Sequence, residues 1–335
     1  MPSLETAVAA VLFGGLTIYV LSGGADFGGG VWDLLARGPR RQAQRDLIAR
    51  AIAPIWEANH VWLIFVIVLL FTGFPRAFAA LSIALHVPLA LLLLGIVMRG
   101  SAFVFRTYDV HPGRRVRHWA VLFAGASIVT PIMLGVIVGA VISGTIRVDV
   151  STGRVLSGYL DSWLGLYPLA VGLFALALFA FLAAVYLTLE TDDPALRDDF
   201  RARALAAQGA VAGLAALSYA LAAQGAPLIR FALQEAWWGR PLQGLAAALA
   251  LGAAWGLLRR RFALARGLAI AEAAVILWGW GLAQYPYLVA PHLTVSNAAA
   301  PAAVLAPLLV VVGLGAAVLF PSLAYLYHVF KARRV

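Results

Sequence analysis

The sequence predicts an all-α fold, a polytopic membrane helix bundle with about nine transmembrane helices. Of its 335 residues, 63% are hydrophobic and only 12% are charged, about half the charged fraction of a soluble domain. Several apolar runs reach the ~18 residues that a membrane-crossing helix needs, and the mean hydropathy of the chain is +0.90. Cysteine is absent, which excludes disulfides, iron–sulfur clusters and thiol nucleophiles.

Nine segments are long and apolar enough to cross ~30 Å of hydrocarbon at ~1.5 Å per residue. They are residues 7–26, 53–73, 77–98, 119–143, 163–189, 204–224, 242–258, 267–288 and 303–330. The first follows Met-Pro-Ser-Leu-Glu-Thr with no basic region, so we expect it to be retained and not cleaved as a signal peptide. The seventh is short and rich in Ala and Gly, which makes it the weakest of the nine.

The 25 basic residues predict the orientation, because Arg and Lys concentrate on the cytoplasmic side of a membrane protein. Taken over alternate loops, they divide 20 to 5. The larger set comprises Arg37, Arg40, Arg41, Arg45, Arg50, Arg99, Arg106, Arg114, Arg115, Arg117, Arg197, Arg201, Arg203, Arg259, Arg260, Arg261, Arg266, Lys331, Arg333 and Arg334. The smaller set comprises Arg76, Arg147, Arg154, Arg230 and Arg240. The split predicts an outer N-terminus, a cytoplasmic C-terminus and no basic residue in mid-membrane.

The net charge of +10 has the same explanation, since Arg residues that flank apolar spans bind anionic headgroups. We therefore expect a lipid membrane as partner and no nucleic acid. The chain reads as one transmembrane domain over residues 1–335. A faint similarity between residues 45–50 and 197–203 permits two four-helix halves with one extra helix.

Three of the 15 acidic residues fall within apolar segments: Asp26, Glu57 and Glu272. With the predicted orientation all three lie at similar depth on the cytoplasmic side. Ionisable groups inside a membrane are costly and often functional, and a carboxyl group in a low-dielectric site can relay protons. Each also has a structural alternative: a hydrogen bond to a neighbouring helix for Glu57, an ion pair with an Arg for Asp26, and a structural role near Arg266 for Glu272.

His60 follows Glu57 by three residues, so both lie on one face of the second span. His86 is expected near mid-membrane, where a packing role is favoured. Only His60, His86, Met98 and Met133 could ligate a haem inside the spans, and they are scattered. Any haem is therefore expected in a partner.

The first span ends in a glycine-rich stretch, residues 22–30. Gly24 and Gly28 form a small-xxx-small face that lets a helix or cofactor approach closely. The same stretch also permits a broken helix that lines a polar cavity.

Taken together, two segments carry a family resemblance. Gly24-Ala25-Asp26-Phe27-Gly28-Gly29-Gly30 is followed by an Arg-rich loop and then by Ile52-Ala53-Pro54-Ile55-Trp56-Glu57-Ala58-Asn59-His60-Val61-Trp62-Leu63. This order closely resembles subunit II of the cytochrome bd quinol oxidases, the cytochrome d ubiquinol oxidase subunit II family. The resemblance continues through Phe74-Pro75, residues 98–106, Tyr285-Pro286-Tyr287-Leu288 and Ser296-Asn297-Ala298, and the first hundred residues carry most of it.

The resemblance implies a nine-helix subunit of the bacterial cytoplasmic (inner) membrane, paired with a larger subunit I. In that family subunit I holds haems b and d and the quinol site, where quinol oxidation is coupled to reduction of oxygen to water. Small single-span subunits can join the complex, and subunit II can carry a structural quinone. Subunit II stabilises the assembly and helps to deliver cytoplasmic protons, for which the resemblance implies Glu57 and Asp26.

The sequence departs from the family pattern at Gly23, where a first acid is expected, and Asp26 or His60 could compensate. Two alternatives remain open from sequence: a proton-coupled secondary transporter and a purely structural oxidase subunit. A transporter would show stronger repeats and broken helices at mid-membrane.

Overall fold

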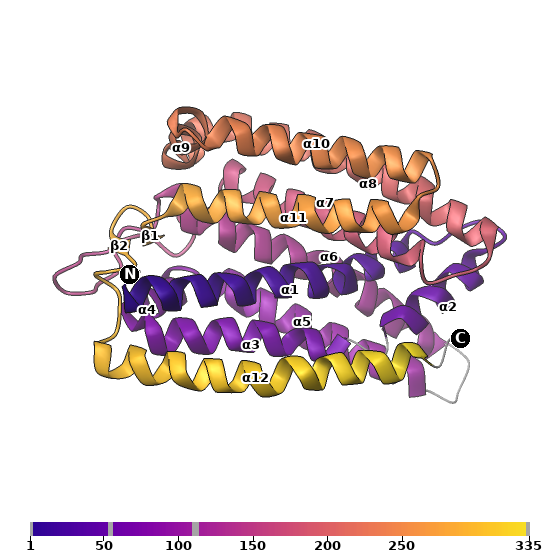
Figure 1. The fold of residues 1–335 in the computed structure, drawn as a ribbon, viewed down its shortest axis with the longest axis horizontal. Coiled ribbons are helices and arrows are strands. Elements are labelled where there is room, and N and C mark those ends of the chain that lie inside the picture. The colour runs from indigo at the N-terminus through magenta and orange to yellow at the C-terminus, as the bar shows by residue number, and fades with distance from the viewer. Residues whose placement is uncertain (1–2, 53–55, 109–113, 333–335) are drawn as a thin grey trace.

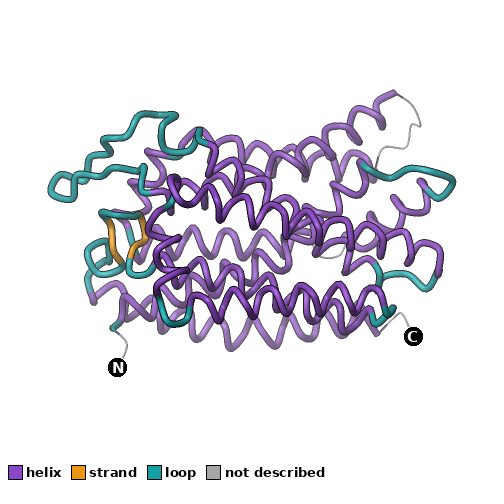
Figure 2. The backbone as a smooth tube through the Cα atoms, turned by 90° about the horizontal axis from the view of Figure 1, so that it is seen from above, coloured by secondary structure: helices purple, strands orange, loops and turns teal. Residues whose placement is uncertain are grey.

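The computed structural model describes residues 3–52, 56–108 and 114–332. Most of this chain forms long helices that run side by side along one axis, with the loops gathered at the two ends (Figures 1 and 2). The predicted all-α membrane bundle is confirmed. α1 begins at one end of the bundle and α12 ends at the other, whereas the side of the membrane on which each lies stays a prediction.

Eight helices of the described chain are long and apolar enough to cross a membrane. They are α1 (Leu4–Leu34), α5 (His86–Tyr108), α6 (Arg114–Ser143), α7 (Leu166–Leu187), α8 (Pro194–Gly225), α10 (Gly239–Leu258), α11 (Phe262–Gln284) and α12 (Ala302–Ala332). α3 (Trp56–Gly73) and α4 (Pro75–Ala84) are long and apolar enough to cross a membrane only when they are taken together. The two helices are bent by 117° at their junction. Counting this pair as one span gives the predicted nine.

The remaining elements lie at the ends of the bundle. α2 (Arg41–Ile52) lies at the end where α12 finishes. The opposite end of the bundle holds α9 (Pro227–Glu235) and also β1 (Tyr287–Val289) and β2 (Leu293–Thr294), which pair in an antiparallel hairpin. The hairpin contains part of the predicted family marker at residues 285–288. The division into two four-helix halves stays a prediction.

Local chemistry explains several helix boundaries. α1 begins after Ser3, whose hydroxyl accepts a hydrogen bond from the amide of Thr6. α8 begins after Asp193, whose carboxylate accepts from the amides of Ala195 and Leu196. Pro194 occupies its first turn, where the missing N–H has no cost. α8 therefore begins ten residues before the predicted span, and the acidic and basic residues that follow Pro194 are helical.

The predicted third span, residues 77–98, is wrong in its first part. Phe74 leaves the helical conformation, with φ −135° and ψ 60°, and Pro75 starts the separate helix α4. A second break at Leu85 (φ −115°, ψ 19°) precedes α5. His86 is consequently the first residue of α5 and not a mid-membrane residue. Its ring packs against Tyr159 of the α6–α7 loop, with ring centroids 5.1 Å apart.

The glycine-rich stretch does not break the first span, because α1 continues to Leu34. Its glycines instead permit close packing, as one of the two sequence interpretations expected. A Cβ atom at Gly28 would collide with the backbone carbonyl of Phe179 on α7, and one at Gly30 would collide with Ser127 on α6. Trp32 adds a buried hydrogen bond from its Nε1 to the carbonyl oxygen of Ala180, at 2.7 Å. α1 is thus fixed between α6 and α7.

Candidate functional site

A buried ion pair joins α1 to α5. Arg99 donates from Nη2 to Oδ1 of Asp26 at 2.6 Å and from Nη1 to Oδ2 at 2.8 Å. Its Nη2 also lies 2.9 Å from the backbone oxygen of Asp26, and its Nε donates to Ser127 Oγ at 3.2 Å. Asp26 is 1% exposed and Arg99 is 2% exposed. Such a bidentate contact satisfies both charges where water is absent.

The placement of Arg99 corrects the sequence prediction. Its assignment to a cytoplasmic loop is wrong, because α5 continues nine residues beyond it to Tyr108. Asp26 likewise does not end its helix, since α1 continues eight residues further. At ~1.5 Å per residue the pair lies roughly 12 Å from those helix ends. A basic residue can occupy this depth because the carboxylate of Asp26 neutralises it. The structure thus shows the structural alternative for Asp26, an ion pair with an Arg.

Two aromatic rings enclose the guanidinium group. The Cζ atom of Arg99 lies 5.0 Å from the ring centroid of Phe27 and 5.1 Å from that of Phe123. Both rings present a π face to the cation, an arrangement that stabilises it in a dry site. Ser127 is fixed in turn, since its hydroxyl donates to the carbonyl oxygen of Phe123 at 2.7 Å. The position of the ion pair is therefore set by three helices, α1, α5 and α6.

The second span brings His60 to the same region. Its ring centroid is 6.1 Å from that of Phe27, which is the neighbour of Asp26 in sequence and one of the two rings that cover Arg99. Asn59, the preceding residue, is 2% exposed. Glu57 belongs to the first turn of α3, three residues before His60, but its side chain lies outside the described residues. Its predicted contact with this region therefore stays a prediction.

At Gly23, the position that departs from the family pattern, a neighbouring side chain covers the space that a larger residue would need. The ring of Tyr19 would lie 3.0 Å from a Cβ atom at Gly23. Tyr19 is 1% exposed, so its ring is buried at this position. The ring of Tyr19, which lies two helical turns before Asp26 on α1, thus covers the position where the family pattern has an acid.

Glu272 is separate from this cluster, because it lies on α11 and its side chain pairs with α8; that the three acids lie at similar depth stays a prediction. α11 begins at Phe262, so Glu272 lies ten residues into it, near its middle. Its partner is Gln208 on α8, whose Nε2 donates to Glu272 Oε1 at 2.8 Å. Arg266, expected nearby, instead lies over the ring of Tyr186 at 5.1 Å.

Arg99, Tyr19 and Gln208 are the residues near these acids that sequence reasoning missed. One signal for Arg99 is available, since the apolar stretch resumes at Ala102-Phe103-Val104-Phe105 and indicates that the helix continues beyond it. Among the residues that the structure describes, no group of three or more His, Asp or Glu side chains could hold a metal ion. The cluster of Asp26, Arg99 and His60 has groups that can pair charges, form hydrogen bonds and transfer protons.

Comparison with known proteins identifies the same family as the sequence motifs. The family model described as "Cytochrome bd terminal oxidase subunit II" matches residues 4–330. The chain is 30% identical over 156 residues to the cytochrome bd ubiquinol oxidase subunit 2 of Bacillus subtilis, covering 46% of this chain and 44% of that protein. It is 28% identical over 154 residues to the cytochrome bd-I ubiquinol oxidase subunit 2 of Escherichia coli K12, covering 45% and 40%.

These alignments span less than half the length of each relative. The fold agrees over a much larger part of the chain. A chain in the structure of the bd oxidase from Geobacillus thermodenitrificans superimposes with a TM-score of 0.81 and covers 98% of both chains, at 23% sequence identity. The long-helix architecture is thus shared with a solved relative.

Proposed function

Because the chain belongs to the family of cytochrome bd terminal oxidase subunit II, we propose that it is the second subunit of a bd-type oxidase. Its partner would be a haem-bearing subunit I in the bacterial cytoplasmic membrane, and the complex would couple quinol oxidation to reduction of oxygen to water. The names of the bacterial relatives and the motif resemblance support this assignment. Haems b and d would be held by the partner, and small single-span subunits would be optional additions.

Within the complex, this chain would stabilise subunit I and help to deliver protons from the cytoplasm. The observation that carries the proposal is the buried pair of Asp26 and Arg99, with His60 next to the Phe27 ring that covers Arg99. Charged groups at this depth are costly, and in membrane proteins they mark ion and proton pathways. The cluster lies in the part of α1 and α5 that is nearer to the predicted cytoplasmic end of the bundle.

The geometry assigns different tasks to the three candidate residues. Both oxygens of Asp26 accept hydrogen bonds from Arg99, so this carboxylate is engaged in the ion pair. Asp26 would therefore fix the electrostatic field and the packing at the entrance. Glu57, in the first turn of α3, would accept the proton, and His60, one turn further along the same face, would pass it inward.

Replacement of Glu57 tests this assignment, because Glu57→Gln keeps the shape of the side chain and removes its proton. We expect slower oxygen reduction by the purified complex with unchanged haem spectra and unchanged assembly. The matched control is Glu5→Gln on α1, which changes a partly exposed carboxyl group at the opposite end of the bundle. Unchanged turnover in Glu57→Gln would favour the purely structural subunit. A colourless protein that purifies alone would favour the transporter.

A further inference from the structure

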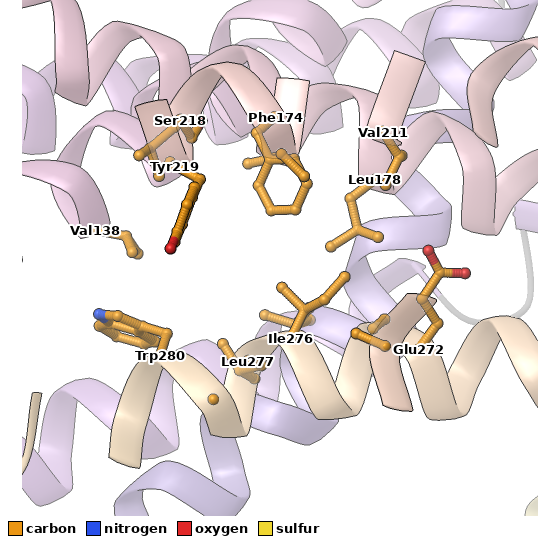
Figure 3. A pocket seen from close by; sticks show the side chains of 18 of the residues that line it. Val138, Phe174, Leu178, Val211, Ser218, Tyr219, Glu272, Ile276, Leu277 and Trp280 are labelled. Carbon is orange, nitrogen blue, oxygen red and sulfur yellow. The ribbon is translucent and has the colours of Figure 1, made fainter. Parts of the chain in front are cut away.

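The half of the bundle away from Arg99 contains a second buried carboxyl group, that of Glu272. It lies in the wall of a cavity of about 600 Å³ that is formed mainly by α7, α8, α10 and α11. Figure 3 shows the Glu272 side chain reaching from α11 toward α8, with Leu178 and Val211 at the same end of the cavity. Glu272 is 2% exposed, and the cavity wall is predominantly apolar. The ionised form of a carboxyl group is costly in such a site.

The hydrogen bonds of this carboxyl group are incomplete if it is ionised. Gln208 on α8 donates from Nε2 to Glu272 Oε1 at 2.8 Å. Glu272 Oε2 and Gln208 Oε1 are buried and have no hydrogen-bond partner within the described chain. Both atoms are acceptors, since neither an ionised carboxylate nor the carbonyl oxygen of an amide carries a hydrogen. The pair of side chains therefore lacks one donor.

A proton on Glu272 Oε2 supplies that donor. A protonated carboxyl group has one O–H that can donate a hydrogen bond, and Gln208 Oε1 can accept it. The terminal torsions of Glu and Gln side chains are broad, so two groups that already share one hydrogen bond can turn to form a second. The acid and the amide then donate to each other, and each buried polar atom of the pair has a partner.

The nearest cations along the two helices are engaged elsewhere. Arg266 lies six residues before Glu272 on α11, and its Cζ atom is 5.1 Å from the centroid of the Tyr186 ring. Arg203 lies five residues before Gln208 on α8, and its Nη2 donates to Gln44 Oε1 at 2.6 Å. Neither guanidinium group lies among the described residues that line the cavity. A carboxylate at Glu272 would thus have no positive charge in the cavity wall to balance it.

The other titratable groups of the cavity wall are phenols. They come from α1, α7 and α8 and are Tyr19, Tyr167 and Tyr219. Among the described lining residues, those from α6, α9 and α10 include no titratable side chain. Glu272 is therefore the group of this wall that can change its charge near neutral pH.

Asp26 shows what this chain places beside a charged carboxylate. Both of its oxygens accept hydrogen bonds from Arg99, and two aromatic rings cover the guanidinium group. Glu272 has a neutral amide in the equivalent place. An apolar site can keep a carboxyl group neutral, so that it donates a hydrogen bond. The different partners therefore indicate opposite charge states for the two buried acids.

We propose that Glu272 is a proton-binding site, which holds its proton at neutral pH and forms a reciprocal acid–amide pair with Gln208. The bound proton joins α8 to α11 at one end of the cavity. Its loss would break the hydrogen bond to Gln208 Oε1 and leave a carboxylate in the apolar wall, so the contact between the two helices depends on pH. The site does not rest on the proposed function, because α8 and α11 do not carry Glu57, His60 or Arg99.

Infrared spectroscopy of the purified protein detects this proton directly, because a protonated carboxyl group has a carbonyl band that an ionised one lacks. We expect such a band in the native protein at pH 7 that is lost in Glu272→Gln. The matched control is Glu235→Gln, which removes an exposed carboxyl group at the end of α9 and should leave the band unchanged. Gln208→Met should shift the band to higher frequency, because the carbonyl loses the hydrogen bond from Nε2. Identical spectra for the native protein and Glu272→Gln, or an unshifted band in Gln208→Met, would overturn the proposal.

The pH dependence of the melting temperature, followed by circular dichroism, is the second measurement. Above pH ~5 the folded protein would hold one proton more than the unfolded chain, so its stability falls as the pH rises. Glu272→Gln keeps both hydrogen bonds and does not titrate. Between pH 5 and pH 9 the native melting temperature should fall by roughly 5 °C or more relative to that of Glu272→Gln. Glu235→Gln should follow the native protein.

Two results of the melting experiment would contradict a bound proton. A difference between the native protein and Glu272→Gln that does not change with pH would show that the acid is ionised throughout. Stabilisation of the native protein by sodium ions, absent in Glu272→Gln, would show that a metal cation occupies the place of the proton. None of these outcomes depends on the turnover of Glu57→Gln.

Discussion

Arg99 holds Asp26 by both carboxylate oxygens, so α1 and α5 are joined by a bidentate ion pair between residues 73 positions apart in sequence. Both side chains are buried, and the rings of Phe27 and Phe123 cover the guanidinium group. Removal of either charge would leave the other without compensation in a low-dielectric site. The pair therefore links the stability of the bundle to the electrostatics of the region where protons are proposed to enter.

Arg99→Met should destabilise the protein by roughly 3–5 kcal/mol, because it leaves the Asp26 carboxylate buried and unpaired. Asp26→Asn should cost a similar amount. The double variant should cost less than the sum of the two, since no uncompensated charge remains. Thermal denaturation of the purified protein, followed by circular dichroism, measures all three. Additive effects in this double-mutant cycle would show that the two residues do not stabilise each other.

Gly28→Ala should destabilise the α1–α7 contact by about 1–3 kcal/mol, because the added Cβ atom collides with the Phe179 carbonyl group. A backbone atom cannot rotate away, so α1 and α7 would have to separate. Gly14→Ala is the control on the same helix, since a Cβ atom there meets nothing within 4 Å. Replacing that glycine should be neutral or stabilising, because Ala favours helix more than Gly does. Equal melting temperatures for the two variants would argue against close packing at Gly28.

Much of the fold could be predicted because it follows from local composition. The apolar run of α7 is continuous, and its ends, Leu166 and Leu187, lie within three residues of the predicted span. The third span was misjudged because hydropathy does not register that Pro75 begins one helix and that Leu85 separates it from the next. Backbone conformation, and not polarity, ends a helix at these positions.

The candidate site was less predictable because its contacts join distant residues. The rule that basic residues mark cytoplasmic loops counts Arg99 by its charge alone and cannot register that Asp26 neutralises it. The cavity beside Glu272 was not predicted either, since it arises from small residues such as Ala215 and Ala246 on facing helices. Small side chains leave a cavity only where the helices that carry them are neighbours, and the sequence alone does not say which helices are neighbours.

Asp199 should matter more than its neighbour Asp198 for the attachment of α2 to α8. Its carboxylate accepts hydrogen bonds from Arg40 Nη2 at 2.6 Å, Arg40 Nε at 2.8 Å and Gln44 Nε2 at 2.8 Å. We expect Asp199→Asn to cost about 1–3 kcal/mol, as for hydrogen bonds to a charged group. Asp198→Asn weakens the ion pair with the exposed Arg260 and should cost less than about 1 kcal/mol. Comparison of melting temperatures decides the order.

The ion pair of Arg40 and Asp199 should also be insensitive to pH in the ordinary range. The hydrogen bond to Asp199 raises the pKa of Arg40 above its already high normal value. A raised pKa means that the contribution to stability is complete below the unfolded pKa and is lost only as the pH rises through the folded pKa. Arg40→Gln should therefore lower the melting temperature by the same amount at pH 6 and at pH 9. A difference that disappears by pH 9 would contradict this assignment.

Gly23→Asp restores the acid of the family pattern and tests why this chain lacks it. The new Cβ atom would lie 3.0 Å from the Tyr19 ring, so that ring would have to shift by a few tenths of an ångström. The carboxylate would also stand one helical turn from Asp26, within reach of like-charge repulsion. We expect a loss of about 1–3 kcal/mol from crowding and repulsion together. Gly23→Ala separates the two causes, because it introduces the crowding without the charge. If the acid limits proton entry, turnover of Gly23→Asp would rise despite the lower stability, whereas unchanged turnover would show that the cluster around Asp26 and His60 works without it.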